Sequence, residues 1–112
     1  MRGKIVLIQF PFDDLSSSKV RPAYCLTRPI GNYRHVIFAL ITSRVEKFSL
    51  ETDLRLDSSH PDFANSGLLK SSIIRLDHLI TLRQSMIRRE LGGLKTDTQS
   101  AIANRLHRML TV

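Results

Sequence analysis

An arginine and a carboxylate stand two residues apart in the segment Arg75-Leu76-Asp77. Residues i and i+2 of a β-strand point to the same face, so Arg75 and Asp77 are expected side by side, with Leu76 facing the core. A guanidinium beside a carboxylate can divide phosphate contact and proton transfer between them. The same spacing also fits a surface ion pair of small energetic value, and the residue types alone leave both interpretations open.

Two further groups of residues could contact a phosphate. Pro22 restricts Arg21 to extended geometry, which would direct the Arg21 side chain from the rim of a sheet. Thr42 and Ser43 close an apolar stretch with two hydroxyl groups. Each pattern also has an ordinary structural explanation, because solvated arginines at loop ends and hydroxyl residues at strand ends are common.

Several well-known catalytic patterns are missing from the sequence. It has no glycine-rich phosphate loop, no G-x-S-x-G elbow and no dense carboxylate cluster that would hold magnesium. The single cysteine, Cys25, lies in an apolar stretch and is expected to be a buried hydrophobe. An enzyme of this composition that acts on phosphodiesters would work without a metal, with arginine stabilising the transition state. The histidines are far apart and are expected to be surface or structural residues: His35, His60, His78 and His107.

The charge of the chain indicates the kind of partner. Its 112 residues carry a net charge of +7 and fit one compact domain, which we assign to residues 1–112. A surplus of Lys and Arg favours polyanions such as phosphate backbones, without deciding between RNA, DNA, an acidic protein and a membrane surface. No apolar run is long enough to span a bilayer, and the first residues lack the shape of a signal peptide, so a cytoplasmic location is expected.

Short apolar and β-branched segments predict a mainly β protein. Residues 13–18 are expected to form an exposed polar loop, residues 58–67 a loop or single helical turn, and Gly92-Gly93 a break in the chain. Pro22 is expected at the start or edge of a strand. The predicted strands are residues 5–10, 23–27, 35–43 (buried on both faces), 51–57, 72–76 with 79–82 as pieces of one extended segment, and 86–89.

Residues 96–110 have the pattern of an amphipathic helix. Thr96 and Gln99 have the spacing of a capping box, and Asp97 falls in the first turn, where the helix dipole favours an anion. The helix should pack on the sheet, or less readily on a partner chain. Strands followed by one helix predict a small curled antiparallel sheet or a partly closed barrel. The apolar stripe consists of Ile102, Leu106, Met109 and Leu110.

These segments resemble the MazF/PemK family of toxins from type II toxin–antitoxin systems. The opening GKIVLIQFPFDDLSSSKVRPAYCLT is similar to the family's first strand, polar loop and Arg-Pro pair, here Arg21-Pro22. The stretch FALITS resembles the third strand, which ends in a functional threonine, here Thr42. The stretch SGLLKSSIIRLDHLITL resembles the segment with Arg-x-Asp on a strand, matching Arg75 and Asp77.

The resemblance implies an SH3-like barrel with a C-terminal helix, a homodimer and a cognate antitoxin protein as partner. It also implies a metal-independent endoribonuclease, without a cofactor, that cuts single-stranded RNA such as mRNA at selected sequences. The RNA 2′-OH would be the nucleophile, so the products would carry a 2′,3′-cyclic phosphate and a 5′-hydroxyl.

The resemblance also suggests roles for individual residues. Asp77 would take the 2′-OH proton, while Arg21 and Arg75 would hold the phosphorane charge and one of them would donate a proton. Arginine holds its proton strongly, so it is a poor proton donor near neutrality. Thr42 would hydrogen-bond a phosphate oxygen. Further RNA contacts are expected from Lys19, Ser18, Ser43 and Ser71, together with the rest of the polar loop.

The chain departs from the family in two places, and two other functions remain open. Lys4 stands where the family has an acidic residue after the opening glycine, and the first loop lacks the histidine that some members carry. One alternative is a CcdB-like toxin that binds DNA gyrase without catalysis, although the chain has no Trp to form that contact. The other is a non-catalytic SH3-like module that binds nucleic acid.

Overall fold

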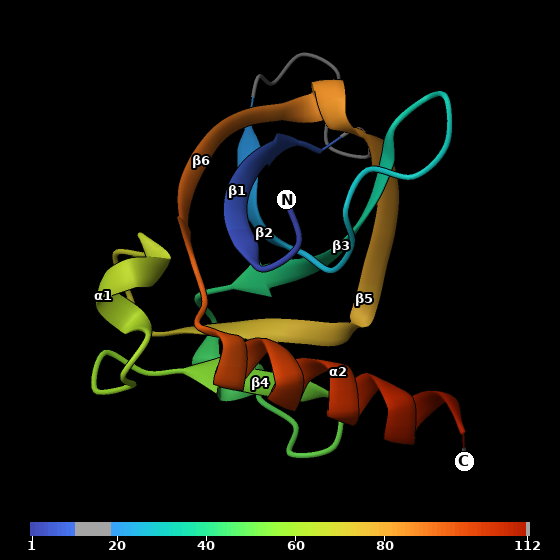
Figure 1. The fold of residues 1–112 in the computed structure, drawn as a ribbon. Helices are drawn as coiled ribbons and strands as arrows, with labels where there is room; N and C mark the ends of the chain where they lie inside the picture. Colours follow the sequence, from blue (N-terminus) through green and yellow to red (C-terminus); the bar gives the residue numbers. More distant parts are fainter. Residues whose placement is uncertain (11–18, 112) are drawn as a thin grey trace.

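One antiparallel sheet with a long C-terminal helix makes up the computed structural model, which describes residues 1–10 and 19–111 (Figure 1). The sheet has six strands in the order β4-β5-β3-β2-β1-β6. The predicted mainly β fold with a C-terminal helix is therefore confirmed. The strands are β1 Lys4–Gln9, β2 Val20–Cys25, β3 His35–Thr42, β4 Asp53–Leu56, β5 Ser72–Arg83 and β6 Ile87–Gly93; the helices are α1 Phe63–Ser66 and α2 Thr96–Leu110, with 3₁₀ turns η1 Val45–Lys47 and η2 Gln84–Met86.

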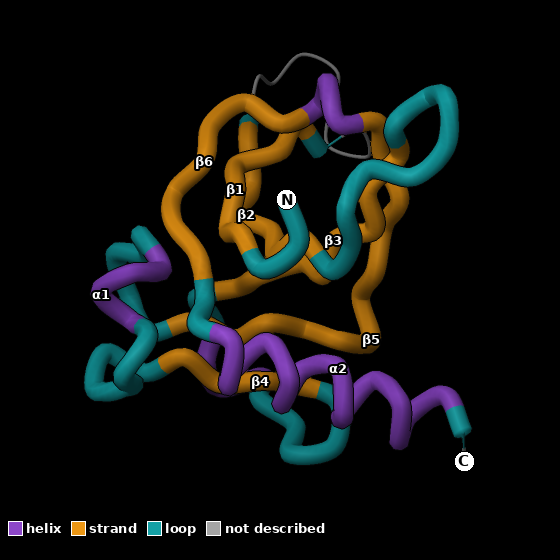
Figure 2. The backbone as a smooth tube through the Cα atoms, viewed as in Figure 1, coloured by secondary structure: helices purple, strands orange, loops and turns teal. Residues whose placement is uncertain are grey.

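The long strand β5 bends sharply in its middle and so gives the sheet its curl (Figure 2). Ala39 of β3 pairs with Leu79, but the next residue, Leu40, pairs with Arg75. Residues 76–78 therefore form a bulge with no partners on β3, and a bulge bends the strand that carries it. The two strand-like pieces expected from the sequence are thus one bent strand.

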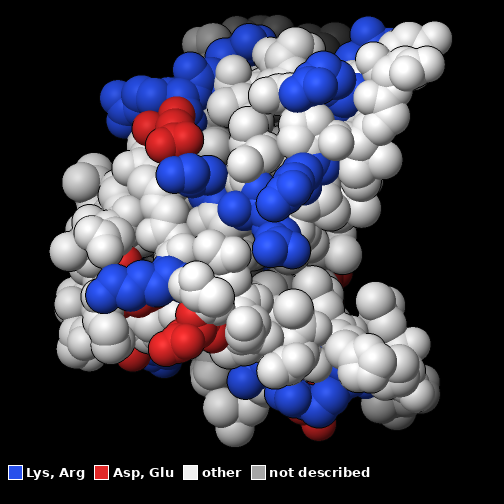
Figure 3. Space-filling model, viewed as in Figure 1, with Lys and Arg blue, Asp and Glu red and all other residues white. Residues whose placement is uncertain are grey.

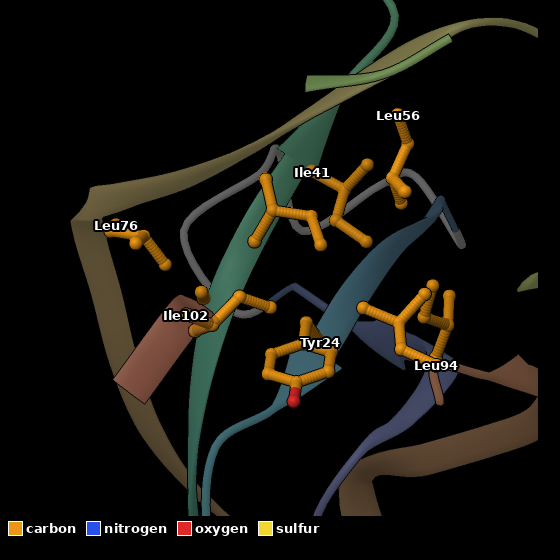
Figure 4. Close-up of a cluster of buried hydrophobic side chains, with 9 residues drawn as sticks. Tyr24, Ile41, Leu56, Leu76, Leu94 and Ile102 are labelled. Atoms are coloured by element: carbon orange, nitrogen blue, oxygen red, sulfur yellow. The ribbon is translucent and has the colours of Figure 1, made fainter. Parts of the chain in front are cut away.

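The alternation of side chains along the strands divides the interior into two clusters. Phe38 lies in a cluster enclosed by the curl of β1, β2, β3, β5 and β6, while its neighbour Ala39 lies in a second cluster beneath α2. Both residues are fully buried, which confirms that β3 is covered on both faces. Figure 4 shows Leu76 from the β5 corner and Ile102 from α2 pointing into the second cluster, near Tyr24.

Helix α2 covers the residues that the sequence predicts, but its N-terminus is held differently. The cap residue is Lys95, and no side chain within the helix caps it, so the predicted capping box is wrong. Instead, the Asp62 carboxylate accepts the Lys95 N–H at 2.9 Å, and Gln99 donates its side-chain amide to the Leu94 carbonyl. The residue that satisfies the helix end therefore comes from a distant loop, which local spacing cannot reveal.

The glycine pair near the chain end belongs to a strand instead of breaking it. Gly92 pairs with Ile5 and Gly93 with Lys4, so β6 runs longer than the four residues predicted. A Cβ atom at Gly92 would collide with the backbone carbonyl oxygen of Asn65. The glycine is required because α1 approaches β6 closely, not because the chain turns there.

Strand β2 begins three residues earlier than predicted and includes Pro22, which pairs with Leu7 of β1. The β2–β3 ladder ends at Ala23, so Pro22 lies where β3 no longer pairs and its missing N–H interrupts no bond to that strand. In α2, Ile102 is buried as predicted, but Leu110 is largely exposed. No helix in the described part of the chain is long and apolar enough to cross a membrane.

Candidate functional site

Arg75 lies on β5, between β3 and the edge strand β4, with an unused hydrogen-bond donor. It pairs with Leu40 of β3 on one side and with Asp53 of β4 on the other. Its side chain is only 25% exposed, and its buried Nε has no hydrogen-bond partner within the described residues. The Asp77 Oδ1 atom lies 3.9 Å from this Nε, too far for a hydrogen bond. A buried donor without a hydrogen bond is costly, and an anion would approach this cation through the exposed part of its side chain.

The bulge of β5 places two proton-carrying groups beside Arg75. The Asp77 carboxylate lies between the Arg75 guanidinium and the His78 imidazole, whose Nε2 is 3.7 Å from Asp77 Oδ2. The predicted proximity of Arg75 and Asp77 is thus observed, but through a bulge instead of the regular pleat. This cluster therefore holds a cation, a carboxylate and an imidazole. Of these groups, the imidazole of histidine is the one best suited to proton transfer near neutrality.

His78 is the site residue that the sequence analysis missed. The wide spacing of the histidines predicts a surface or structural residue here, and regular alternation would place His78 on the face opposite Asp77. In the structure it is nearly half exposed and contacts the Asp77 carboxylate, because the bulge interrupts the alternation. Its position directly after Asp77, between two strand-like pieces, was the only signal available.

Thr42 stands on the neighbouring strand and on the same face as Arg75. It pairs with Ile73, which makes it the diagonal neighbour of Arg75 at a Cβ separation of about 7–8 Å. The Thr42 Oγ1 accepts the N–H of Arg44 at 3.1 Å, so the hydroxyl proton is left to donate to another group. Ser43 follows directly and is exposed.

Arg21 lies at the rim of this face. The last β2–β3 pair is Ala23 and Leu40, and both Arg21 and Thr42 lie two residues beyond it, so their side chains point to the same side. Arg21 is exposed, and its guanidinium carbon lies 5.9 Å from the centre of the Phe10 ring. This is at the outer limit of a cation–π contact.

The residues predicted to contact RNA are scattered. Lys19 is exposed immediately before β2, and its carbonyl accepts the Gln9 side-chain amide at 3.3 Å. Ser71 directly precedes β5, where its Oγ accepts the Ser58 N–H at 2.9 Å and ties that loop to the strand. Ser18 lies outside the described residues, as does the predicted loop 13–18. The structure thus groups Arg75 and Asp77, sets Thr42 beside them, and leaves Arg21 and Lys19 at the rim.

The Cys25 thiol and the Tyr24 hydroxyl, two other ionisable groups, are buried in the core. Cys25 is fully buried, and burial raises the pKa of its thiol to about 11, so it is a neutral hydrophobe as predicted. Burial likewise raises the pKa of the Tyr24 hydroxyl to about 12. Within the described residues, no group of three or more His, Cys, Asp or Glu side chains could hold a metal ion.

Solved structures of toxins share this fold over almost the whole chain. The Mycobacterium tuberculosis toxin MazF-mt6 superposes with a TM-score of 0.72 at 24% identity, covering 97% of both chains. MazF from Deinococcus radiodurans gives 0.67 at 20% identity, covering 99% of this chain and 96% of its own. An endoribonuclease in complex with its cognate antitoxin, from a mycobacterial species, gives 0.68 at 17% identity and covers 100% and 95%.

The sequence itself identifies the family. Residues 1–110 match the model of PemK-like, MazF-like toxins of type II toxin–antitoxin systems. The chain therefore belongs to the PemK/MazF toxin family, and the resemblance deduced from its motifs is confirmed. No sequence among the curated proteins matches it significantly.

Proposed function

We propose that this toxin is a metal-independent endoribonuclease that cuts single-stranded RNA by attack of the RNA 2′-OH. The observation that carries the proposal is the buried Arg75 Nε, which has no hydrogen-bond partner among the described residues and lies beside Asp77 and His78, on the same face as Thr42. The net charge of +7 supports a phosphate-rich substrate. The structural relative described as an endoribonuclease supports the same reaction class.

The geometry suggests a division of roles. Asp77 would take the proton from the 2′-OH as its oxygen bonds to phosphorus, giving a 2′,3′-cyclic phosphate. As the bond from phosphorus to the 5′-oxygen breaks, a protonated His78 would supply the proton that makes the 5′-hydroxyl. An imidazole is a better proton donor near neutrality than a guanidinium, so we assign this step to His78 and not to either arginine.

The remaining residues would hold the phosphate. Arg75, poorly solvated and lacking a hydrogen bond at Nε, would stabilise the charge that develops on the phosphorane. The Thr42 hydroxyl would donate to a phosphate oxygen. Arg21 and Lys19, exposed at the rim, would contact neighbouring phosphates of the same strand. This arrangement requires no cofactor.

The partners follow from the family and the surface. We propose a cognate antitoxin protein as the inhibitor, as in the structural relative solved with its own antitoxin. We also propose a homodimer, because an apolar hollow of about 400 Å³ runs between α2 and the sheet and includes the exposed side chains of Leu79 and Leu110. We place the protein in the cytoplasm, where mRNA is found.

The test is cleavage of a long single-stranded RNA by the purified protein in EDTA, with the product ends identified. The wild type should leave cyclic phosphates, and a 2′-deoxy strand should remain intact. Arg75→Gln and Thr42→Val should lose activity, while Thr42→Ser should retain most of it. Arg108→Gln, a matched loss of one charge on α2, should cut like the wild type.

Three results would contradict the proposal. Cleavage that stops in EDTA would show that a metal is needed, and cleavage of the deoxy strand would exclude the 2′-OH as nucleophile. A folded protein that cuts no RNA would favour the two other functions, a gyrase-binding toxin or a non-catalytic SH3-like module, and a gyrase supercoiling assay would separate them.

A further inference from the structure

A second polar hollow lies at the opposite end of the β3–β5 ladder from Thr42. It has a volume of about 490 Å³, and none of the described residues that line it is acidic. The β2–β3 loop and η2 form its walls and lie side by side at the upper edge of the molecule in Figure 1. We call it the Tyr33 hollow; its lining residues are Asn32, Tyr33, Arg34, Arg83, Gln84 and Ser85.

The Tyr33 ring is an exposed aromatic surface with a cation against it. The side chain is 68% exposed, which is unusual for a ring of this size. The Arg83 guanidinium carbon lies 5.0 Å from the ring centre, and the His35 ring meets Tyr33 edge-on at 6.3 Å. These two contacts orient the ring, and most of its surface remains open to solvent.

The second arginine is fixed in place by the backbone. Arg34 has φ +53°, and within the described residues no other non-glycine residue has a positive φ. Its carbonyl accepts the Gln84 N–H at 2.8 Å, and its Nε donates to the Gln84 side chain at 2.9 Å. The positive φ closes the turn between Ile30 and His35, and the contacts with Gln84 hold the Arg34 side chain beside the hollow.

The hollow adjoins the rim where Arg21 lies. Ile87 follows η2 directly and pairs with Ile8, which in turn pairs with Arg21. Two strand spacings separate Ile87 from Arg21, a distance on the order of 10 Å. Figure 3 shows several Lys and Arg side chains along the upper part of the face in view, with one group of acidic side chains on the left. The Tyr33 hollow, through η2, and Arg21, through Ile8, therefore both adjoin the start of β6.

We infer that the Tyr33 hollow is a second RNA subsite, which stacks one unpaired base on Tyr33 and holds its phosphates with Arg34 and Arg83. The inference rests on the proposed ribonuclease function and extends its substrate to several nucleotides beyond the cut. An open ring beside guanidinium groups is the arrangement that binds unpaired bases. An acidic peptide would use the arginines but has no group that requires the exposed ring.

The test is the affinity of the protein for 2′-O-methyl RNA, which cannot be cut because its nucleophile is blocked. Fluorescence anisotropy would compare a dodecanucleotide with a tetranucleotide that fills the Arg75 surface alone. Tyr33→Leu should weaken dodecanucleotide binding by about 10-fold, the loss expected for one base stack. Tyr33→Phe should bind like the wild type, and no variant of Tyr33 should change the affinity for the tetranucleotide.

Two variants that each remove one positive charge test whether RNA affinity depends on the position of the charge or only on the net charge. Arg83→Gln should weaken dodecanucleotide binding more than Arg108→Gln, which removes the same charge from α2. Equal losses in both variants would overturn the inference, as would wild-type affinity in Tyr33→Leu. It would also be overturned if Tyr33→Leu weakened binding of a poly-glutamate peptide while its RNA affinity stayed unchanged.

The same experiment separates this inference from the proposed function. A protein that binds the dodecanucleotide through Tyr33 but cuts no natural RNA would overturn the ribonuclease proposal and leave the subsite. A protein that cuts RNA while Tyr33→Leu binds normally would overturn the subsite alone. Wild-type protein that neither binds nor cuts would overturn both. Circular dichroism of each variant confirms that the fold is intact.

Discussion

Two neighbouring regions of the molecule satisfy their polar groups differently. One is the contact between α2 and the sheet, the other is the corner of β5, and Leu76 lies between them. At the helix contact, Arg105 donates to the carbonyls of Leu50 and Asp53, and Asp62 caps the helix N-terminus. At the corner, the buried Nε of Arg75 has no hydrogen-bond partner among the described residues.

This difference in hydrogen bonding indicates which region contributes to stability and which is available for function. A contact that has satisfied its donors and acceptors contributes to folding and has nothing left to offer a ligand. At the corner of β5, the Arg75 guanidinium is poorly solvated and incompletely paired. This lowers the free energy of unfolding, and the binding of a phosphate would offset the loss. Substitutions at the helix contact should therefore change unfolding, and substitutions at the corner should change cleavage.

The largest effect is expected from Arg75→Gln. Because the guanidinium is assigned to transition-state charge, its loss should lower kcat/KM for RNA cleavage about 10²–10³-fold. Chemical denaturation should show little loss of stability, since the variant removes a buried charge without a hydrogen bond at Nε. A cleavage loss below about tenfold, or a large drop in the unfolding free energy, would contradict the assignment of Arg75 to cleavage instead of stability.

Ile102→Ala should give the converse result. Ile102 is 1% exposed in the cluster beneath α2, and truncation of such a side chain costs about 2–5 kcal/mol of unfolding free energy. Ile102→Val should cost about 1 kcal/mol, as expected for a smaller cavity. Urea titration measures both. Cleavage per folded molecule should stay at the wild-type level. A variant that is stable but inactive would contradict the idea that this contact serves stability and not catalysis.

Asp62→Asn tests how the helix N-terminus is held and should make stability less dependent on pH. Burial opposes ionisation of Asp62, but hydrogen bonds from Thr98 and the Lys95 N–H, with the nearby charges of His60 and Lys95, outweigh it and lower the carboxyl pKa. The variant should lose about 1–2 kcal/mol near neutral pH.

The sign of the pH effect follows from the lowered pKa. A carboxyl with a lower pKa in the folded state stabilises the protein above the unfolded pKa of about 4 and loses that contribution as pH falls through the folded value. The gap between wild type and Asp62→Asn should therefore narrow below about pH 4. Asp97→Asn, an exposed residue of the same helix, is the control; an equal pH dependence in both variants would refute the role of Asp62.

The smallest effect is expected from Lys4→Ala, which lies outside both regions. Lys4 pairs with Glu90 at 3.7 Å, and both side chains are about half exposed, so solvent screens the pair. The unfolding free energy should change by less than about 0.5 kcal/mol, and RNA cleavage should not change. A larger loss that disappears in high salt would show that this lysine, which replaces the family's acidic residue, has a structural role.

Local patterns predicted most of the secondary structure. The β-branched runs gave five of the strands close to their observed places, and α2 runs over Thr96–Leu110 as its apolar spacing indicates. Arg75 and Thr42 were also predicted as site residues from the sequence, through their positions on strands that resemble the family, and this assignment stays a prediction. These features depend on residues within a few positions of each other, so one sequence contains the information for them.

The missed features all depend on contacts between distant segments. Asp62 accepts the N–H of Lys95, the N-cap residue of α2, which lies 33 residues later, and Gly92 is required by the approach of α1. His78 joins Asp77 because β5 bulges against β3, and a bulge is fixed by pairing between strands instead of by the residues that form it. A periodic pattern cannot reveal an interruption that another strand imposes.

The sequence by itself determined the strands, the long helix, the basic charge and the family, because these follow from residue types and short spacings. The tertiary structure alone decided which polar groups have partners. It left the Arg75 Nε without a hydrogen bond in the part of the chain that the structure describes, brought His78 to Asp77, and set Tyr33 against Arg83. The physical reason is that burial and hydrogen bonding are properties of packed neighbours, and those neighbours come from parts of the chain that meet only after folding.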